Sequence, residues 1–371
     1  MKTPNGFEVI QLFEQYSPKK LAVEGDKIGL QVGTLNKPIQ KVMVALDVLD
    51  EVVDEAIEKG IDLIIAHHPI IYRPLQKITD DGQGKLLQKL IKHDIAVYAA
   101  HTNLDVAKGG VNDLLSDCLK LQNTEVLVPT YSSSLKKLVV FVPEDAAEDL
   151  RAALGKAGAG FIGNYSHCSF STLGEGRFLP EDGANPYIGQ KGQLEKVNEV
   201  KIETIFPEEL EKKVLNSMIK AHPYEEVAYD IYPLHNKGEE LGLGRIGELP
   251  KEMTLKEFAQ YVKESLDVKG VRVVGNLETT VKKVAVLGGD GNKYVTSAKF
   301  KGADVYVTGD MYYHTAHDAM MLGLNIVDPG HNVEKVMKKG VAEKMSQLAE
   351  DQGYQVEFIP SEINTDPFTF L

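Results

Sequence analysis

The chain has 371 residues, of which 43% are hydrophobic and 26% are charged, and its formal net charge is −13 at pH 7. This length and composition predict a globular protein with two or more domains and ample core. The acidic balance argues against a broad nucleic-acid surface or an anionic membrane as the partner, although a local basic patch would remain compatible with it.

The first predicted unit is a strand–helix–strand segment. Residues 41–47 predict a short apolar strand, residues 50–58 a helix, and residues 61–66 a buried strand that is followed directly by His67 and His68. Neighbouring side chains on a strand point in opposite directions. The two imidazoles therefore suit two separate targets, such as two metal ions about 3.5–4 Å apart. A pair of hydrogen-bonded structural histidines at a strand end is the alternative.

The middle of the chain has a different pattern. Strands are predicted at 137–143, 200–205 and 227–232, helices at 144–156 and 208–220, and two further strand-like segments around the Gly-rich stretches 174–178 and 183–187. This is the element order of a ferredoxin-like fold. We expect a self-contained α+β module inserted into a larger domain made from both ends of the chain. Residues 235–240 are the predicted return linker.

The later part of the chain repeats the first unit. Residues 41–66 align without a gap to residues 283–308 at a constant offset of 242 positions, with Gly60 and Gly302 as predicted helix C-caps. Strands that alternate with helices predict a mostly parallel sheet with helices on both faces. Chance similarity between two such units is the alternative.

Polar clusters follow the predicted strands, at the edge of the sheet where ligands bind in such folds. The cluster residues His67, His68, Asp105, His331 and Glu334 offer three imidazoles and two carboxylates. This mixture suits zinc, manganese or iron better than a thiolate-selecting metal. His331 and Glu334 are three positions apart at a predicted helix start, so they share a face, and a carboxylate such as Glu334 can bridge two ions. Taken singly, Asp105 is typical of a turn or cap, and Glu334 of a solvated helix surface.

Several of these segments together resemble the signatures of the NGG-interacting factor three-like family, whose members are often labelled GTP cyclohydrolase I type 2 homologues. The segments are residues 65–69, 101–105, 307–310 with His314, 330–334, and the Gly-Leu-x-Val-Gly stretch 29–33. Residues 25–27 are Gly-Asp-Lys, where the family usually has Trp-Asp-Asn. Residues 183–189 and 221–226 resemble the PII/CutA-like insert of the longer bacterial members.

The resemblance implies an α/β fold with a three-layer αβα core built from two similar halves, residues 1–128 and 239–371. Residues 129–238 would form the inserted ferredoxin-like (PII/CutA-like) α+β domain. It also implies a ring-shaped homohexamer with a two-metal site in each subunit. By motif position, His67 and Asp105 would hold one ion and His68 and His331 the other, with Glu334 as the bridge.

Two divalent ions, with zinc expected first and manganese or iron as alternatives, can lower the pKa of a bound water towards about 7. The leading hypothesis is therefore hydrolysis of a small nucleotide-like or phosphorylated substrate, with imidazole opening of GTP as one version. The candidate catalytic groups are His101, Asp310 and His314, which could transfer protons or orient metal ligands. Structural hydrogen bonding at strand ends is their alternative role. The chain has no GxxxxGK[ST] phosphate loop, and no feature selects guanine.

Another class of function also fits the sequence: a non-catalytic, metal-responsive regulatory or scaffold protein. Within the insert, His222, the Glu225-Glu226 pair, Tyr187 and Tyr224 could bind a small ligand, or they could be interface or loop residues. Nucleic-acid binding is disfavoured by the acidic balance.

The expected compartment is the cytoplasm. Cys118 and Cys168 are the two cysteines, and they lie far apart and form no CxxC pair, as in reduced intracellular proteins. The N-terminus lacks the long apolar stretch of a signal peptide, and no later run is long enough to span a bilayer.

Overall fold

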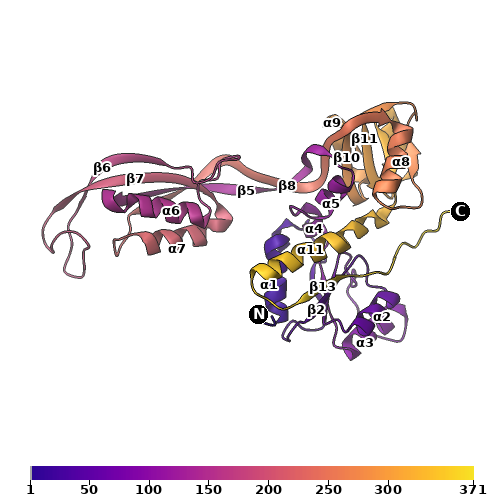
Figure 1. The fold of residues 1–371 in the computed structure, drawn as a ribbon, viewed down its shortest axis with the longest axis horizontal. Helices are drawn as coiled ribbons and strands as arrows, with labels where there is room; N and C mark the ends of the chain where they lie inside the picture. Colours follow the sequence, from indigo (N-terminus) through magenta and orange to yellow (C-terminus); the bar gives the residue numbers. More distant parts are fainter. Residues whose placement is uncertain (1) are drawn as a thin grey trace. The chain divides into compact units, whose positions relative to one another are not determined.

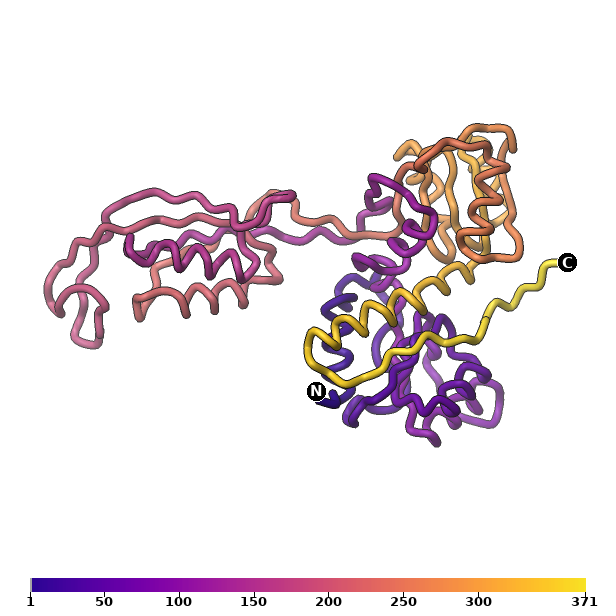
Figure 2. The backbone as a smooth tube through the Cα atoms, in the orientation of Figure 1, coloured from indigo at the N-terminus to yellow at the C-terminus, as the bar shows by residue number. Residues whose placement is uncertain are grey.

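The computed structural model describes residues 2–371 and divides into two compact units. Unit 1 comprises Met1–Tyr131 and Leu241–Leu371, and unit 2 comprises Ser132–Glu240. The chain begins in unit 1, forms unit 2 and returns to complete unit 1, as the colours of Figure 2 show. None of the helices within residues 2–371 has the length and hydropathy that crossing a membrane requires.

The first sheet of unit 1 has five strands in the order β1-β4-β3-β2-β13. Their bounds are β1 (Gly29–Val32), β2 (Lys41–Ala45), β3 (Leu63–Ala66), β4 (Ala96–Ala99) and β13 (Glu357–Pro360). The strands β13, β2, β3 and β4 are parallel, and β1 is an antiparallel edge. Every residue of β3 is buried, as its continuous apolar run predicts.

The second sheet of unit 1 is built around the repeated unit. Its strands run in the order β8-β10-β11-β12-β9, with bounds β8 (Tyr229–Thr254), β9 (Arg272–Val274), β10 (Thr280–Asp290), β11 (Val305–Gly309) and β12 (Asn325–Asp328). The three central strands are parallel, and β8 and β9 pair with them antiparallel. Val42 pairs with Leu63 in the first unit, and Val284 pairs with Val305 in the second, so the two units share one register.

The expectation of one mostly parallel sheet for the two repeated units is wrong. Each unit lies in its own sheet, because β2 pairs with β13 and β10 pairs with β8, which leaves neither first strand free to pair with the other unit. A strand pattern in the sequence shows which segments are strands but does not show which edges they use.

Helices cover both sheets of unit 1 (Figure 1). Their bounds are α1 (Gly6–Tyr16), α2 (Asp50–Lys59), α3 (Gly82–Lys92), α4 (Thr102–Val106), α5 (Val111–Cys118), α8 (Leu255–Ser265), α9 (Val295–Phe300), α10 (Tyr313–Met321) and α11 (Val336–Asp351), with short 3-10 helices η1 (Lys19–Leu21), η4 (Asn292–Tyr294) and η5 (His331–Lys335). Met43 and Ile64 face α2 and α3, whereas Val44 faces α5 and α11 and shares a buried cluster with Val286 of the second sheet. One continuous core therefore fixes the two sheets of unit 1 to each other.

Unit 2 has its own buried core. Its elements are β5 (Gln122–Pro143), η2 (Glu144–Ala146), α6 (Ala147–Ala157), β6 (Phe170–Phe178), β7 (Glu195–Pro207), η3 (Glu208–Leu210), α7 (Glu211–Ala221) and the first part of β8. The strands lie in the order β6-β7-β5-β8, and α6 and α7 interrupt them along the chain. The sequence predicts two further strand-like segments before the strand at 200–205, whereas the described residues form only β6 there.

Two segments of the insert for which the sequence predicts no strand, a Gly-rich stretch and the return linker, belong to strands. Residues 174–178 belong to β6, where they pair residue by residue with β7. Residues 235–240, the predicted linker, belong to β8, and the backbone N–H of Glu239 donates to the Ser133 hydroxyl at 3.0 Å. Glycine and charge runs indicate loops only where no neighbouring strand satisfies the backbone, and here a neighbouring strand does so.

Candidate metal centre

The candidate metal centre lies in unit 1, where strand ends of the two sheets meet. His67 and His68 directly follow β3, and Asp105 lies in α4, which follows β4. His331 and Glu334 lie in η5, directly after β12 of the other sheet. The structure thus brings together the five residues that the sequence selects as ligands, from segments far apart along the chain.

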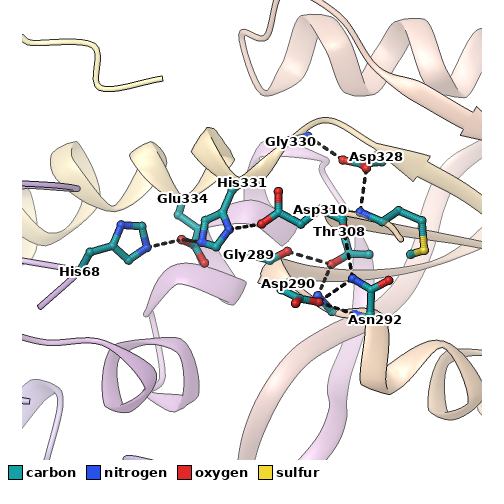
Figure 3. Close-up of polar contacts among 12 residues, drawn as sticks. His68, Gly289, Asp290, Asn292, Thr308, Asp310, Asp328, Gly330, His331 and Glu334 are labelled. Atoms are coloured by element: carbon teal, nitrogen blue, oxygen red, sulfur yellow. Dashed lines mark hydrogen bonds and ion pairs between the residues drawn. The ribbon is translucent and has the colours of Figure 1, made fainter. Parts of the chain in front are cut away.

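Glu334 is at the middle of this cluster. Its Oε2 lies 3.1 Å from His68 Nε2, 3.2 Å from His331 Nε2 and 3.6 Å from His67 Nε2, and the side chain is only 4% exposed. Figure 3 shows the imidazoles of His68 and His331 directed at this carboxylate. In the 3-10 turn of η5, residues three apart are eclipsed, which aligns His331 with Glu334.

His67 and Asp105 face each other without forming a hydrogen bond. The distance between His67 Nε2 and Asp105 Oδ1 is 3.6 Å, and among the described residues neither atom has a hydrogen-bond partner although both are buried. Buried polar atoms are rarely left unpaired. A nitrogen and a carboxylate oxygen that converge in this way fit a divalent cation, and imidazole with carboxylate is a donor set that zinc and related metals use.

The other ring nitrogen of each cluster histidine is held by an acceptor. His68 Nδ1 lies 2.6 Å from Asp47 Oδ1, His331 Nδ1 lies 2.6 Å from Asp310 Oδ2, and His67 Nδ1 lies 3.0 Å from the carbonyl oxygen of Ala100. In each ring Nδ1 thus donates and Nε2 faces the cluster. Metal-ligating histidines usually have this arrangement, since the outer acceptor fixes the tautomer and the orientation of the ring.

The three candidate catalytic residues have different positions. His101 Nδ1 lies 2.8 Å from Asp26 Oδ1, and the ring is close enough to His67 and His68 to form a possible metal-holding group with them. Asp310 is the acceptor for His331, and its backbone is in the left-handed region at a φ of 54°. His314 lies on α10 with its ring against Tyr313, and it belongs to none of the groups that the described residues form.

The electrostatics of the cluster follow from burial and from the carboxylates. Burial lowers the pKa of His68, but its hydrogen bonds with Asp47 and Glu334 outweigh burial and raise the pKa to about 10. The hydrogen bond with Glu334 raises the pKa of His331 to about 9 against the effect of burial. Burial raises the pKa of Asp105 to about 6, although the nearby His67 opposes it. The carboxylates of the cluster thus favour a cation, which in the metal-free protein is a protonated imidazole.

Glycine at position 289 keeps the space beside the cluster open. A Cβ on Gly289 would lie 2.7 Å from Glu334 Oε1 and 3.2 Å from His331 Nε2, and the backbone has a φ of +65°. Glycine adopts this conformation at little cost, whereas a side chain would both strain the backbone and press on the two predicted ligands.

A cavity of about 660 Å³ opens beside the cluster within unit 1. His68, His101 and His331 border it on one side. Tyr72 and the C-terminal residues Phe368 and Phe370 also line it, and these three rings are 64%, 67% and 48% exposed. The site is therefore accessible, and aromatic surface lies next to the polar cluster.

Sequence reasoning missed two carboxylates of the site, Asp47 and Asp26. Asp47 is the last residue of the predicted strand 41–47, at the same sheet edge as His68, and that position was the available signal. Asp26 holds His101 and also accepts from the Thr102 backbone N–H at 3.0 Å, where α4 begins. Its position beside the Gly-Leu-x-Val-Gly stretch gave no indication of a contact with His101, because the two residues are distant in the sequence.

The fold and the cluster define a class: a mixed α/β protein whose two sheets position a histidine–carboxylate cluster that could hold metal ions. The chain belongs to the Duf34/NIF3 (NGG1p interacting factor 3) family, whose profile matches residues 4–367. The family resemblance seen in the sequence is thereby confirmed.

Similar proteins span the whole chain. It is 65% identical over 371 residues to a Bacillus subtilis protein named GTP cyclohydrolase 1 type 2 homolog, and 54% identical over 372 residues to a Listeria innocua protein of the same name, each covered in full. The solved structure of a Bacillus cereus protein related to NIF3 is 64% identical with a TM-score of 0.95, and that of Staphylococcus aureus protein SA1388 is 32% identical with a TM-score of 0.77. Both structures are covered in full, as is this chain.

Proposed function

We propose that the chain is a dinuclear metal-dependent hydrolase of a small nucleotide-like or phosphorylated substrate. The observation that carries the proposal is the pair of buried, unpartnered atoms His67 Nε2 and Asp105 Oδ1 beside a carboxylate that faces three imidazoles. A GTP cyclohydrolase-type reaction is one version of it, supported by the name of the Bacillus subtilis relative.

Two overlapping groups support the assignment of ligands. His67, Asp105 and Glu334 form one possible metal-holding group, and His68, His331 and Glu334 form another. Glu334 is the residue common to both, so we assign it as the bridge. Zinc is the first choice of metal, with manganese and iron as alternatives, because the donors are imidazoles and carboxylates without a thiolate.

Bound ions would supply an acidified water and charge stabilisation at an oxygen of the substrate. The residues of the chain would perform the remaining tasks. His101, oriented by Asp26, can hold or move a proton at its Nε2, which is the nitrogen that Asp26 leaves free. Asp47 and Asp310 are positioning residues, because each fixes the ring of a predicted ligand. Among the described residues, His314 belongs to no metal-holding group, and it is the weakest of the candidates.

The aromatic side of the cavity supports a substrate with a planar ring. Tyr72, Phe368 and Phe370 offer exposed faces beside the cluster. A nucleobase can stack on such faces, and base stacking on an aromatic side chain contributes about 1–3 kcal/mol.

Two further parts of the proposal concern the insert and the assembly. We assign residues 129–238 as a PII/CutA-like domain, on the basis of its strand–helix–strand–strand–helix–strand order and its motifs. The resemblance to the family supports a homohexamer, and mass photometry of the purified protein would test that state directly.

Turnover assays test the proposed function. The protein with its native metal is incubated with a panel of nucleotides and phosphoesters, beside the variants His68→Ala and Asp105→Asn. The control is His93→Ala, because the residue is exposed and belongs to none of the metal-holding groups that the described residues form. We expect the first two variants to lose both metal and turnover, and His93→Ala to retain both. Metal retention in the parent with no turnover on any substrate would contradict hydrolysis.

A non-catalytic regulatory or scaffold protein is the second candidate. The observation in its favour is unit 2, which has a core of its own and contributes no residue to the metal-holding groups of the described chain. In that case the His68→Ala change would alter metal content and assembly, and the parent protein would have no turnover to lose.

A further inference from the structure

A second cavity lies entirely within unit 2, far along the chain from the residues of the metal centre. Its volume is about 850 Å³, and it is bordered by the end of β6, the loop after it, β7 and the segment before β8. Ligand sites commonly occupy roughly 300–1,000 Å³, so this volume suits a small molecule.

Aromatic rings form one wall of the cavity. The ring centroids of Phe178 and Tyr224 are 6.0 Å apart at an interplanar angle of 61°, and those of Tyr187 and Tyr224 are 6.2 Å apart at 53°. Tyr187 is 57% exposed, so its face is open. The face of an aromatic ring attracts a cation, so a cavity wall made of three aromatic residues suits a positively charged ligand.

Carboxylates line the same cavity and are held by neutral donors. Glu199 Oε1 accepts a hydrogen bond from the Tyr224 hydroxyl at 2.9 Å, and Glu225 Oε1 accepts one from the Asn185 backbone N–H at 2.6 Å. Glu181 and Glu226 add two more carboxyl groups to the lining. Neutral donors orient a carboxylate without cancelling its charge, so the cavity keeps a negative potential.

The one basic residue of the lining is engaged elsewhere. The guanidinium of Arg177 lies with its Nε and its Nη2 each 2.8 Å from Glu175 Oε1. Arg177 therefore does not neutralise Glu199 or Glu225, and within residues 2–371 neither of these two carboxylates is in an ion pair.

Gly176 makes room for the central carboxylate. A Cβ at this position would overlap the carboxylate of Glu199. The absence of a side chain on β6 thus leaves room for the carboxylate of Glu199 on the paired strand β7, and both residues line the cavity.

We propose that this cavity binds a small organic cation that carries an alkylated ammonium or a guanidinium group. The aromatic rings would contact the cationic head group of the ligand, and Glu199 and Glu225 would pair with its positive charge. This inference does not depend on the proposed function of unit 1. It assigns a ligand-binding role to Tyr187, Tyr224 and Glu225. From the sequence, these residues could either bind a small ligand or be interface or loop residues.

Isothermal titration of the full-length protein tests the site. Choline represents the alkylated ammonium, agmatine represents the guanidinium, and 3,3-dimethylbutanol is the neutral analogue of choline with the same shape. We expect at least one of the two cations to bind at a single site per chain and the neutral analogue to bind at least about tenfold more weakly. Binding of choline alone or agmatine alone would identify the head group.

Variants then locate the binding. Glu199→Gln keeps the size of the side chain and removes its charge, and Tyr187→Leu removes an exposed ring. Each should weaken binding of the cation by about tenfold. Glu203→Gln is the matched control, because Glu203 lies on the same strand, pairs with Lys201 at 3.1 Å and does not line the cavity. His68→Ala should also leave the affinity unchanged.

Three results would overturn the proposal. One is failure of both cations to bind at millimolar concentration, and another is equal binding of 3,3-dimethylbutanol. The third is an affinity that Glu203→Gln reduces as much as Glu199→Gln. The comparison of choline with its neutral analogue uses the unmodified protein, so it decides the question even if a variant fails to fold.

Discussion

His67 Nε2 and Asp105 Oδ1 are buried polar atoms that no hydrogen bond within the described chain satisfies. Leaving a buried polar group unpaired costs about 1–3 kcal/mol. A cation bonded to both atoms would remove this free-energy cost. The metal-free cluster is therefore less stable than the cluster with a bound ion. At the scale of single residues, this is the physical basis of the proposed centre.

Asp47 is the residue-scale test of how the ligands are positioned. Replacing it by asparagine keeps the size of the side chain but removes the charged acceptor of His68 Nδ1. Loss of such an outer partner typically lowers metal affinity by about 10- to 100-fold. We expect this loss in competition titrations with a chromogenic chelator.

The control is Asp54→Asn, which removes an exposed carboxylate that pairs with Lys89 at 2.6 Å. Its metal affinity should equal that of the parent. Equal affinity of Asp47→Asn and the parent would mean that Asp47 does not position a ligand.

Proton release on metal binding is the second residue-scale prediction. In the metal-free protein the pKa is raised to about 10 for His68 and to about 9 for His331. Both rings are therefore positively charged, with a proton on each nitrogen, at pH 7.5. A metal binds the neutral ring, so uptake should release about two protons from these residues. Apparent metal affinity should therefore rise with pH and level off near the two pKa values.

Calorimetric titration in buffers of different ionisation enthalpy measures the number of protons released. His68→Ala should release fewer protons than the parent. A heat of metal binding that is the same in every buffer would mean that no protons are released. That result would contradict the protonated states of His68 and His331.

At the scale of elements, the strand ends were predictable and the strand pairing was not. The apolar run before His67 and His68 predicts a buried strand, and the gapless repeat predicts the second unit with the same register. Parallel strands place their carboxyl ends at a shared edge, which explains why His67, His68 and Asp105 lie together after β3 and β4. His331 and Glu334 follow β12 of the other sheet, so their approach to this edge depends on how the two sheets of unit 1 pack. The division into two sheets depends on which edge each strand uses. That choice is made by β13, which is distant from β2 in the sequence, and by β8, which pairs with β10.

The outer partners of the site were not predictable for a related reason. Asp26 reaches His101 over 75 positions of chain. A single aspartate in a loop has no pattern that predicts such a contact. Residues 235–240 show the opposite error, since their polar composition predicts a linker while their pairing in β8 makes them strand.

Gly289 is the element-scale test, because it lies where β10 ends against η5. Gly289→Ala would place a Cβ 2.7 Å from Glu334 Oε1 at a φ of +65°. We expect a loss of about 1–2 kcal/mol from backbone strain, together with a marked loss of metal affinity from displacement of Glu334.

Gly60→Ala is a matched control, since Gly60 also has a φ of +65° but no atom lies within 4 Å of its Cβ position. Both variants should lose similar stability in urea unfolding, and only Gly289→Ala should lose metal. Equal metal affinity in the two variants would show that the close approach to Glu334 is unimportant.

At the scale of the whole molecule, the buried hydrophobic clusters of the described chain divide between the two units, with three in unit 1 and one in unit 2. The core of unit 1 joins both of its sheets, and unit 2 has a separate cluster around Val140, Leu150 and Phe206. All five predicted metal ligands lie in unit 1, and the cavity with the aromatic wall lies in unit 2. The two proposed sites thus belong to different compact units of the chain.

Metal removal should therefore act on one unit. A ligand present at 100 times its Kd stabilises the state that binds it by about 2.7 kcal/mol. We expect chelation with EDTA to increase amide hydrogen exchange in β3, β4 and η5 and to leave β6, β7 and α7 unchanged. Faster exchange in unit 2 to the same extent would show that the two units do not respond independently.

The most direct test of the central claim is the metal content of untagged protein, measured by inductively coupled plasma mass spectrometry beside His68→Ala. A dinuclear centre predicts about two transition-metal ions per chain in the parent and fewer in the variant. A parent protein that contains no metal, and takes up none after incubation with zinc, manganese or iron, would contradict the account of this cluster as a metal centre.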